Sequence, residues 1–375
     1  AAMTAGMLCL GSVGLSGVEN VLKSVGTVLS ASAEETAETE RVPVGTGTTT
    51  VRVGTGTTQL EYEVYNDDTV GITNCDNEAA GNLEIPAEID GKPVTSIGNG
   101  AFIACSSLTE ITIPGSVTSI GVQAFEECSS LTEITIPNSV TSIGVRAFRN
   151  CGNLTEITIP DSITSIGAEA FDGTPWLTAK QAENPLVIVN HILIDGQTCI
   201  GSVLIPSGVT SIGYDAFYDC TSLNTIIIPD SVTSIGSGVF GNCTSLTEIT
   251  IPDSVMNIGD FAFSGCSSLT EITIPDSVTS IGGFVFQETP WLAEKQAENP
   301  LVIINHILID GTACTGTVVV PDNVTSIANG AFFECVNLIT ITLSDSIKNI
   351  GDYAFSDCDS LTNITIPDSV TSIGD

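Results

Sequence analysis

The heptapeptide Leu-Thr-Glu-Ile-Thr-Ile-Pro stands at residues 108–114, 131–137 and 154–160, and related segments follow it in the same phase to the C-terminus. Successive copies are 23 residues apart. A fixed period of this length is the signature of a repeat architecture, in which each repeat packs only on its neighbours. The period therefore predicts one stack of coils for most of the 375 residues, in place of two or three globular domains.

The columns of the repeat predict how each coil is built. The alternation Ile-x-Ile predicts a short strand with one buried face, and the next Pro ends that strand because it cannot donate a ladder hydrogen bond. A turn and a second extended segment, Val-Thr-Ser-Ile, follow. A recurrent Gly is expected at a positive-φ corner; it occupies Gly121, Gly144, Gly167, Gly213, Gly236, Gly259, Gly282, Gly351 and Gly374. A recurrent Phe is expected to stack as one aromatic spine, from Phe102, Phe125, Phe148, Phe171, Phe217, Phe240, Phe263, Phe286, Phe332 and Phe355.

This pattern resembles the 23-residue leucine-rich repeats of the BspA-like family of bacterial and protist surface proteins. The Leu, Ile, Pro, Ala-Phe and Cys columns match from Leu83 to Asp375. The resemblance implies a mostly β repeat solenoid, a right-handed leucine-rich-repeat coil with a parallel sheet on its concave side. It also implies that the solvent face of the first strand is the usual binding surface.

Composition outside the repeats predicts the remaining segments. Residues 1–33 are apolar and end in Ala31-Ser32-Ala33, which predicts a secretory signal peptide whose basic n-region is missing. Residues 34–59 hold Val-Gly-Thr-Gly-Thr-Thr twice and are expected to form a linker or weak strands. An N-terminal β cap is expected at 60–84, and the solenoid at 85–375, where it stops midway through a repeat, so a further module is expected beyond.

Two repeats, around 174–205 and 289–320, are of double length and keep the phase. A short helix is expected to replace the first strand in each, at 176–183 and 291–298, followed by two strands about Asn190 and Asn305. Trp176 and Trp291 are 115 residues apart, which indicates a duplicated unit of five coils. Each Trp is interpreted as a core anchor of its insert, with a role in specificity as the alternative.

Net charge is −35, from 44 acidic and 9 basic residues. Phosphates attract Lys and Arg, so this balance argues against nucleic acid and against anionic membrane surfaces. Self-repulsion favours a soluble monomer. No segment after residue 33 is apolar enough to span a bilayer, which predicts no membrane insertion of the mature chain.

Cysteine and histidine carry little signal for chemistry. Eight of the 12 Cys share one column, which predicts a ladder of buried thiols, with disulfides or metal as alternatives. His191 and His306 follow Asn at predicted turns and have no other ligand at metal spacing. We therefore predict no catalytic residue, no cofactor and no metal site.

The remaining candidate is a protein-binding face on the first strand of each coil. One column holds Glu110, Glu133, Glu156, Glu248 and Glu271, and a second holds Thr112, Thr135, Thr158, Thr250 and Thr273. Thr225 and Ile227 break the regularity in the same two columns. On a parallel sheet these columns form adjacent rows on one face. Their uniformity leaves open that they only keep the sheet hydrated.

The resulting hypothesis is a secreted or cell-surface, non-enzymatic leucine-rich-repeat protein that mediates protein binding or adhesion. The resemblance implies protein ligands such as host matrix or neighbouring-cell surface proteins. The alternative is a spacer or display solenoid without a ligand of its own, part of a larger multidomain surface protein with its C-terminal module beyond this chain.

Overall fold

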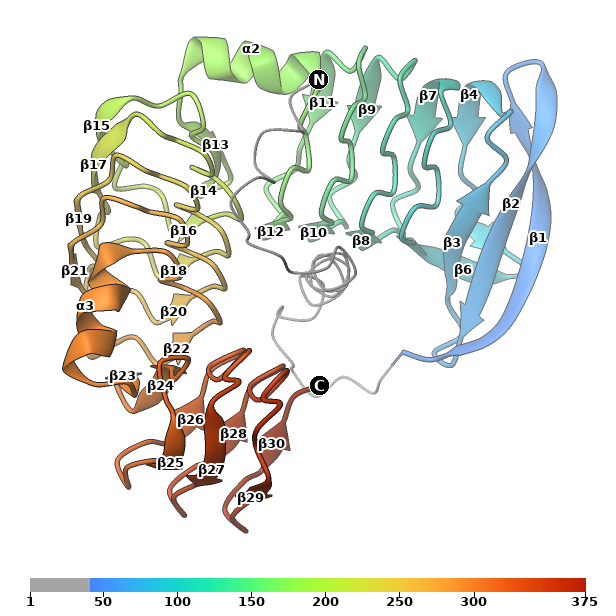
Figure 1. Cartoon of the computed structure of the whole chain (residues 1–375). Coiled ribbons are helices and arrows are strands. Elements are labelled where there is room, and N and C mark those ends of the chain that lie inside the picture. The colour runs from blue at the N-terminus through green and yellow to red at the C-terminus, as the bar shows by residue number, and fades with distance from the viewer. Residues whose placement is uncertain (1–40) are drawn as a thin grey trace. The chain divides into compact units, whose positions relative to one another are not determined.

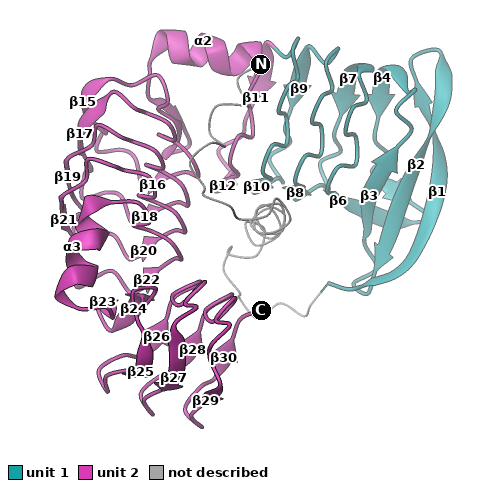
Figure 2. Ribbon diagram, in the orientation of Figure 1, with its two compact units in different colours: residues 1–154 teal, residues 155–375 magenta. Residues whose placement is uncertain are grey.

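The computed structural model describes residues 41–375, which form a mostly β parallel solenoid of about 13 turns (Figure 1). The described residues divide into two compact units, unit 1 up to residue 154 and unit 2 from 155 to 375 (Figure 2). The expected signal peptide at 1–33 lies outside the described residues. Within residues 41–375, no helix is long and apolar enough to cross a bilayer.

Unit 1 is a sheet whose antiparallel centre extends into two rows of parallel strands. The central strands are β1 (Pro43–Val53), β2 (Gly56–Tyr65) and β3 (Val70–Cys75). From β1 the first row runs through β4 (Ala80–Glu84), β7 (Ser107–Thr112) and β9 (Glu133–Thr135), and from β3 the second row runs through β6 (Lys92–Ile97), β8 (Ser119–Ile120) and β10 (Ser142–Ile143). The short β5 (Glu88–Ile89) pairs with β6. The antiparallel strands β1, β2 and β3 thus join the two rows and close the end of the stack.

The Gly/Thr tandem forms strands at residues 43–53 and 56–59, so of the two expectations for 34–59 the structure has strands there and not a linker. The tandem is part of the N-terminal cap, because it contacts side chains that lie elsewhere in the sequence. The ring of Tyr62 covers Gly47 so closely that a Cβ there would overlap it. Arg41 Nη1 donates to Ser96 Oγ (3.0 Å), and its guanidinium carbon lies 3.7 Å from the centre of the Tyr65 ring.

Unit 2 repeats the two rows, and two helices interrupt the first. The first row contains β11 (Glu156–Thr158), β15 (Gly201–Leu204), β17 (Leu223–Ile227), β19 (Glu248–Thr250), β21 (Glu271–Thr273), β25 (Gly316–Val319), β27 (Leu338–Thr342) and β29 (Asn363–Thr365). The second row contains β12 (Ser165–Ile166), β14 (Ile192–Asp195), β16 (Ser211–Ile212), β18 (Ser234–Ile235), β20 (Asn257–Ile258), β22 (Ser280–Ile281), β24 (Ile307–Asp310), β26 (Ser326–Ile327), β28 (Asn349–Ile350) and β30 (Ser372–Ile373). Within the regular coils the second-row strands pair in parallel with a shift of one repeat, as in Ile212 opposite Ile235.

The two inserts match their prediction. Helices α2 (Pro175–Glu183) and α3 (Pro290–Glu298) each take the place of a first-row strand. The hairpins β13 (Val187–Val189) with β14 and β23 (Val302–Ile304) with β24 follow them. In Figure 2 the coils of unit 2 bend towards the second row, so the first row lies on the outer side of this bend. The implied placement of the first strand on a concave side is therefore wrong in unit 2.

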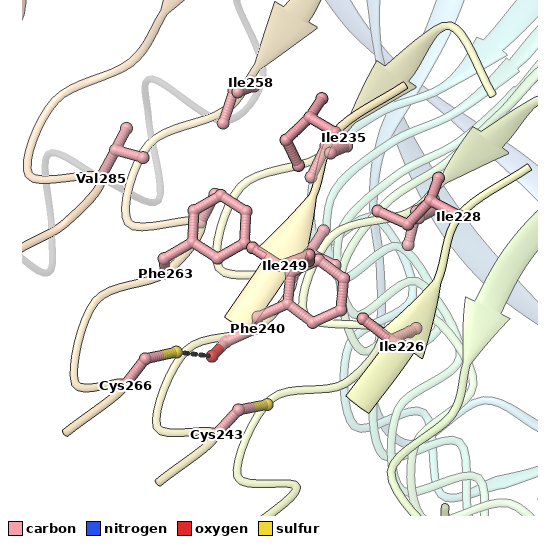
Figure 3. Close-up of a cluster of buried hydrophobic side chains, with 14 of the residues drawn as sticks. Ile226, Ile228, Ile235, Phe240, Cys243, Ile249, Ile258, Phe263, Cys266 and Val285 are labelled. Carbon is pink, nitrogen blue, oxygen red and sulfur yellow. Dashed lines mark hydrogen bonds between the residues drawn. The ribbon is translucent and has the colours of Figure 1, made fainter. Parts of the chain in front are cut away.

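The buried Phe side chains stack between coils, but they do not form one spine. In unit 2, Phe217, Phe240, Phe263 and Phe286 follow one another with ring centres 5.3 to 5.5 Å apart. Figure 3 shows the middle pair, Phe240 and Phe263. Phe286 then packs on Trp291, with centres 4.5 Å apart. The next stack, Phe332 on Phe355, has Gly311 against its first ring. The inserts therefore divide the aromatic core of unit 2.

The Cys column forms the predicted ladder of thiols, which are buried except for the half-buried Cys358. Cys266 Sγ donates to the carbonyl oxygen of Phe240 at 3.0 Å (Figure 3), and Cys243 Sγ does the same to Phe217 at 3.2 Å. Cys128 repeats the contact in unit 1, to Phe102 at 3.1 Å. Each thiol thus satisfies a carbonyl of the preceding coil and fills a gap beside the Phe stack.

The recurrent Gly does not have positive φ, and that expectation is wrong. Positive φ occurs two residues later, for example at Arg146 (φ 56°), and again just before the Cys, at Asn150 (φ 58°). The recurrent Gly is required by close approach of the coils. A Cβ on Gly144 would overlap the carbonyl carbon of Gly121 and lie 2.5 Å from Val122 N.

Candidate protein-binding face

The predicted Glu and Thr columns form exposed rows in both units. In unit 1, Glu110 and Thr112 lie on β7, and Glu133 and Thr135 lie on β9, with Glu110 directly opposite Glu133. Asn82 Nδ2 donates to Glu110 Oε2 at 2.6 Å, which ties the first member of the row to β4. We call this surface the Glu/Thr face of unit 1.

The Glu/Thr face of unit 2 is interrupted by the helices. Glu156 and Thr158 lie on β11, before α2. After it come Thr225 and Ile227 on β17, then Glu248 and Thr250 on β19, then Glu271 and Thr273 on β21. Strands β19 and β21 are in register, so Glu248 faces Glu271 and Thr250 faces Thr273. All of these side chains are exposed except that of Thr225, which is half-buried.

The face loses its charge directly after each helix. Ser202 on β15 and Thr317 on β25 occupy the Glu column, and Leu204 and Val319 occupy the Thr column. Thr225 Oγ1 donates to Ser202 Oγ at 2.8 Å. Sequence reasoning missed these residues because the double-length repeat hides its second coil. Counting back four and two positions from Pro206, as from Pro114 to Glu110 and Thr112, would have found Ser202 and Leu204.

Each insert is anchored by packing and by a helix cap. Trp176 is buried and lies 4.8 Å from Phe171, measured between ring centres. Thr174 Oγ1 accepts a hydrogen bond from Leu177 N at 3.1 Å, which satisfies a free amide of the first turn. Thr289 and Trp291 repeat this arrangement in α3. The Trp residues are therefore core anchors, the interpretation preferred from the sequence.

A carboxyl group joins each helix to the second row, and it is buried at Asp195 and half-buried at Asp310. Asp195 on β14 is 4% exposed and accepts a hydrogen bond from Gln181 Nε2 at 3.1 Å. Desolvation by burial raises the pKa of Asp195, and the Gln181 hydrogen bond opposes this shift. Gln296 and Asp310 form the same pair in α3, at 2.9 Å, and burial raises the pKa of Asp310. The Gln–Asp hydrogen bond therefore links each helix to the neighbouring second-row strand.

The histidines have turn positions in the two hairpins. Asn190 and His191 both have positive φ (46° and 68°), the conformation of a two-residue hairpin turn. His191 Nδ1 lies 2.8 Å from the carbonyl oxygen of Gly208 and carries the proton, because that oxygen only accepts. His306 repeats this contact with Asn323. Within residues 41–375, no group of His, Cys, Asp or Glu is arranged to hold a metal ion.

The parallel solenoid and its 23-residue period are those of a leucine-rich-repeat protein. The chain belongs to the family described as BspA type leucine rich repeat region, whose repeats match residues 77–192, 195–315 and 303–375. A search of curated proteins finds no match.

Solved structures of bacterial leucine-rich-repeat proteins resemble the chain. A leucine-rich repeat protein from Bacteroides ovatus is 26% identical, with 84% of this chain and 89% of that chain covered and a TM-score of 0.34. A leucine rich cell surface protein from Faecalibacterium prausnitzii is 26% identical, with 84% and 94% covered and a TM-score of 0.33. The pneumococcal vaccine antigen PcpA is 17% identical, with 86% and 93% covered and a TM-score of 0.31.

Proposed function

We propose that this protein is an exported, non-enzymatic binding module whose Glu/Thr faces contact a protein ligand, in the manner of an adhesin. Protein binding fits the family to which the chain belongs. The ligands implied are host matrix or neighbouring-cell surface proteins. The observation that carries the proposal is the in-register pair Glu248 and Glu271.

Glutamates placed directly opposite each other act against folding. Neighbouring strands lie about 4.8 Å apart, well within the Debye length of about 8 Å at physiological salt. Like charges in this arrangement are destabilising, by a few tenths of a kcal/mol up to about 1 kcal/mol. Thr alone would keep the sheet hydrated without this repulsion. A row of exposed carboxylates that the fold does not need is explained by a partner with complementary basic groups.

The test is capture of purified matrix and cell-surface proteins by the wild-type chain and by a Glu248→Lys, Glu271→Lys variant. The matched control is Glu288→Lys, Glu334→Lys, which makes the same change in net charge at exposed positions outside the strands. We expect the face variant to lose binding and the control to keep it. Equal binding by both variants refutes the face. Absence of any ligand for the wild type supports the spacer alternative.

A further inference from the structure

Two strands of unit 2 have an edge that no other strand covers. β15 ends the sheet that it forms with β17, and β25 ends the sheet that it forms with β27 and β29. Within residues 41–375, no strand pairs with the outer edge of either one. The reason is the insert, which contributes α2 or α3 where the other coils contribute a first-row strand, so β15 and β25 have no strand to pair with on that side.

The backbone of β15 shows which groups this edge presents. Gly201 N donates to the carbonyl oxygen of Ser222 at 2.8 Å, and Ile205 N donates to that of Ile227 at 3.1 Å, both towards β17. Alternate residues of a strand direct their backbone groups to opposite sides. Ser202 and Leu204 therefore direct their N–H and C=O groups to the edge that pairs with no strand.

The second edge has the same construction. Gly316 N donates to the carbonyl oxygen of Asn337 at 2.8 Å, and Val320 N donates to that of Thr342 at 2.9 Å. The N–H and C=O groups of Thr317 and Val319 therefore point to the edge of β25 that pairs with no strand. Two edges with one design, in the two copies of a duplicated insert, argue against an accident of a single coil.

The side chains beside these edges are aliphatic and exposed. Leu204 is 66% exposed and Ile227, its neighbour on β17, is 62% exposed. Val319 is 65% exposed. The regular coils place Thr in this column, as at Thr250 and Thr273, and the apolar residues occur only in the first or second coil after an insert. An uncovered strand with exposed aliphatic side chains is a template for strand pairing.

The charge of unit 2 defines the chemistry of what can pair there. Residues 155–375 contain no Arg and three Lys, against 26 Asp and Glu. Lys180 and Lys295 are already paired with Glu183 and Glu298, at 3.2 and 3.0 Å. An acidic segment would be repelled from such a surface, and a basic one attracted.

We propose that β15 and β25 each accept an extended, basic segment of a partner protein as an added strand. The segment hydrogen-bonds to the backbone of Ser202 and Leu204, or of Thr317 and Val319. It places an apolar side chain beside Leu204 or Val319 and carries Lys or Arg at its other exposed positions. Backbone pairing then supplies affinity, and the alternate side chains supply specificity. This inference rests on the proposed protein-binding function and names the class of partner.

The probe is a fluorescein-labelled synthetic peptide, Lys-Val-Thr-Val-Lys-Val-Thr-Lys, with binding to the full chain followed by fluorescence anisotropy. The key variant is Leu204→Pro with Val319→Pro, which removes the outward N–H from both edges without breaking a bond to β17 or β27. We expect the dissociation constant to rise about tenfold or more, as for the loss of at least one hydrogen bond and its packing. The control is Leu204→Thr with Val319→Thr, which restores the regular column and keeps both donors. It should lose less affinity than the Pro variant.

Hydrogen exchange of the wild type keeps the test valid should the Pro variant fail to fold. The peptide should slow amide exchange in residues 200–205 and 315–320 and leave 248–250 and 271–273 unchanged. Protection at 248–273 alone, or equal affinity of the wild type and a folded Pro variant, overturns the inference. A dimer in sedimentation that the Pro variant dissociates also overturns it, because a second copy would then occupy the edge. Failure of the peptide to bind, together with ligand loss in the Glu248→Lys, Glu271→Lys variant, overturns the edge and leaves the proposed function standing.

Discussion

Replacing Gly144 by Ala tests how the coils are stacked. A Cβ at this position would overlap the carbonyl carbon of Gly121 and lie 2.5 Å from Val122 N. Both contacts are with backbone, which cannot rotate away as a side chain would. Gly144 is also held in place, because its N–H donates to the carbonyl oxygen of Ile120 at 2.8 Å. The added methyl group must therefore push two coils apart.

The expected cost follows from the balance of two effects. Forcing an extra group into a well-packed site costs about 1–3 kcal/mol. Replacing Gly by Ala also restricts the unfolded chain and stabilises by about 0.4–1 kcal/mol where the conformation allows it. The close contact is the larger effect, so Gly144→Ala should lower the free energy of unfolding. Gly152 offers a matched control, because its Cβ would have no neighbour within 4 Å and its φ is not positive.

The assay is urea unfolding of the full chain followed by circular dichroism. Gly144→Ala should lower the unfolding midpoint, and Gly152→Ala should leave it unchanged or raise it slightly. If the two variants behave alike, close approach of the coils does not explain the recurrent Gly.

Three further predictions concern the inserts and the core. Trp291→Ala should lower the free energy of unfolding by about 3–5 kcal/mol, because its buried ring packs on Phe286; a loss below about 1 kcal/mol in urea unfolding would show that α3 does not depend on it. Asp195→Asn should stabilise the fold at neutral pH, because the raised pKa of Asp195 means that its charged form opposes folding. The gain in stability should shrink as pH falls through the folded pKa towards the unfolded value of 3.8. The same difference in melting temperature between variant and wild type at pH 7 and at pH 4 would contradict this. Burial raises the pKa of Cys151 and Cys266 to about 12, so the native chain should react slowly with a thiol reagent at pH 8 and quickly once unfolded without reductant. Few reactive thiols after unfolding would indicate disulfides.

The regular coils could be predicted from the sequence because each column has one local cause. The alternation about Ile249 and Ile272 predicted β19 and β21, and the phase across the double repeats predicted α2 and α3. The sequence left open whether the Gly/Thr tandem is a linker or forms strands, because Arg41 and Tyr62 make their contacts with residues that periodicity does not bring together. A recurrent Gly shows only that a side chain is not tolerated, and it does not separate positive φ from close packing.

The candidate site was predicted in part for the same reason. The Glu and Thr columns are periodic, and the structure places them on exposed strands. Their interruption in unit 2 depends on the width of a helix within a row of strands, which periodicity does not describe. Leu204 and Val319 lie in the second coil of each double-length repeat. The first coil of these repeats has a helix where the repeat motif would stand, so the motif does not mark the column of Leu204 and Val319.

The most direct test of the Glu/Thr face is photo-crosslinking from the face itself during ligand capture. A photoreactive amino acid replaces Thr250 on β19, and in a second variant it replaces Ser280 on β22, which is also exposed but lies in the second row. We predict that the ligand captured by the wild type crosslinks to position 250 and not to position 280. Crosslinking at position 280 and none at position 250 would contradict the assignment of the first row as the binding surface.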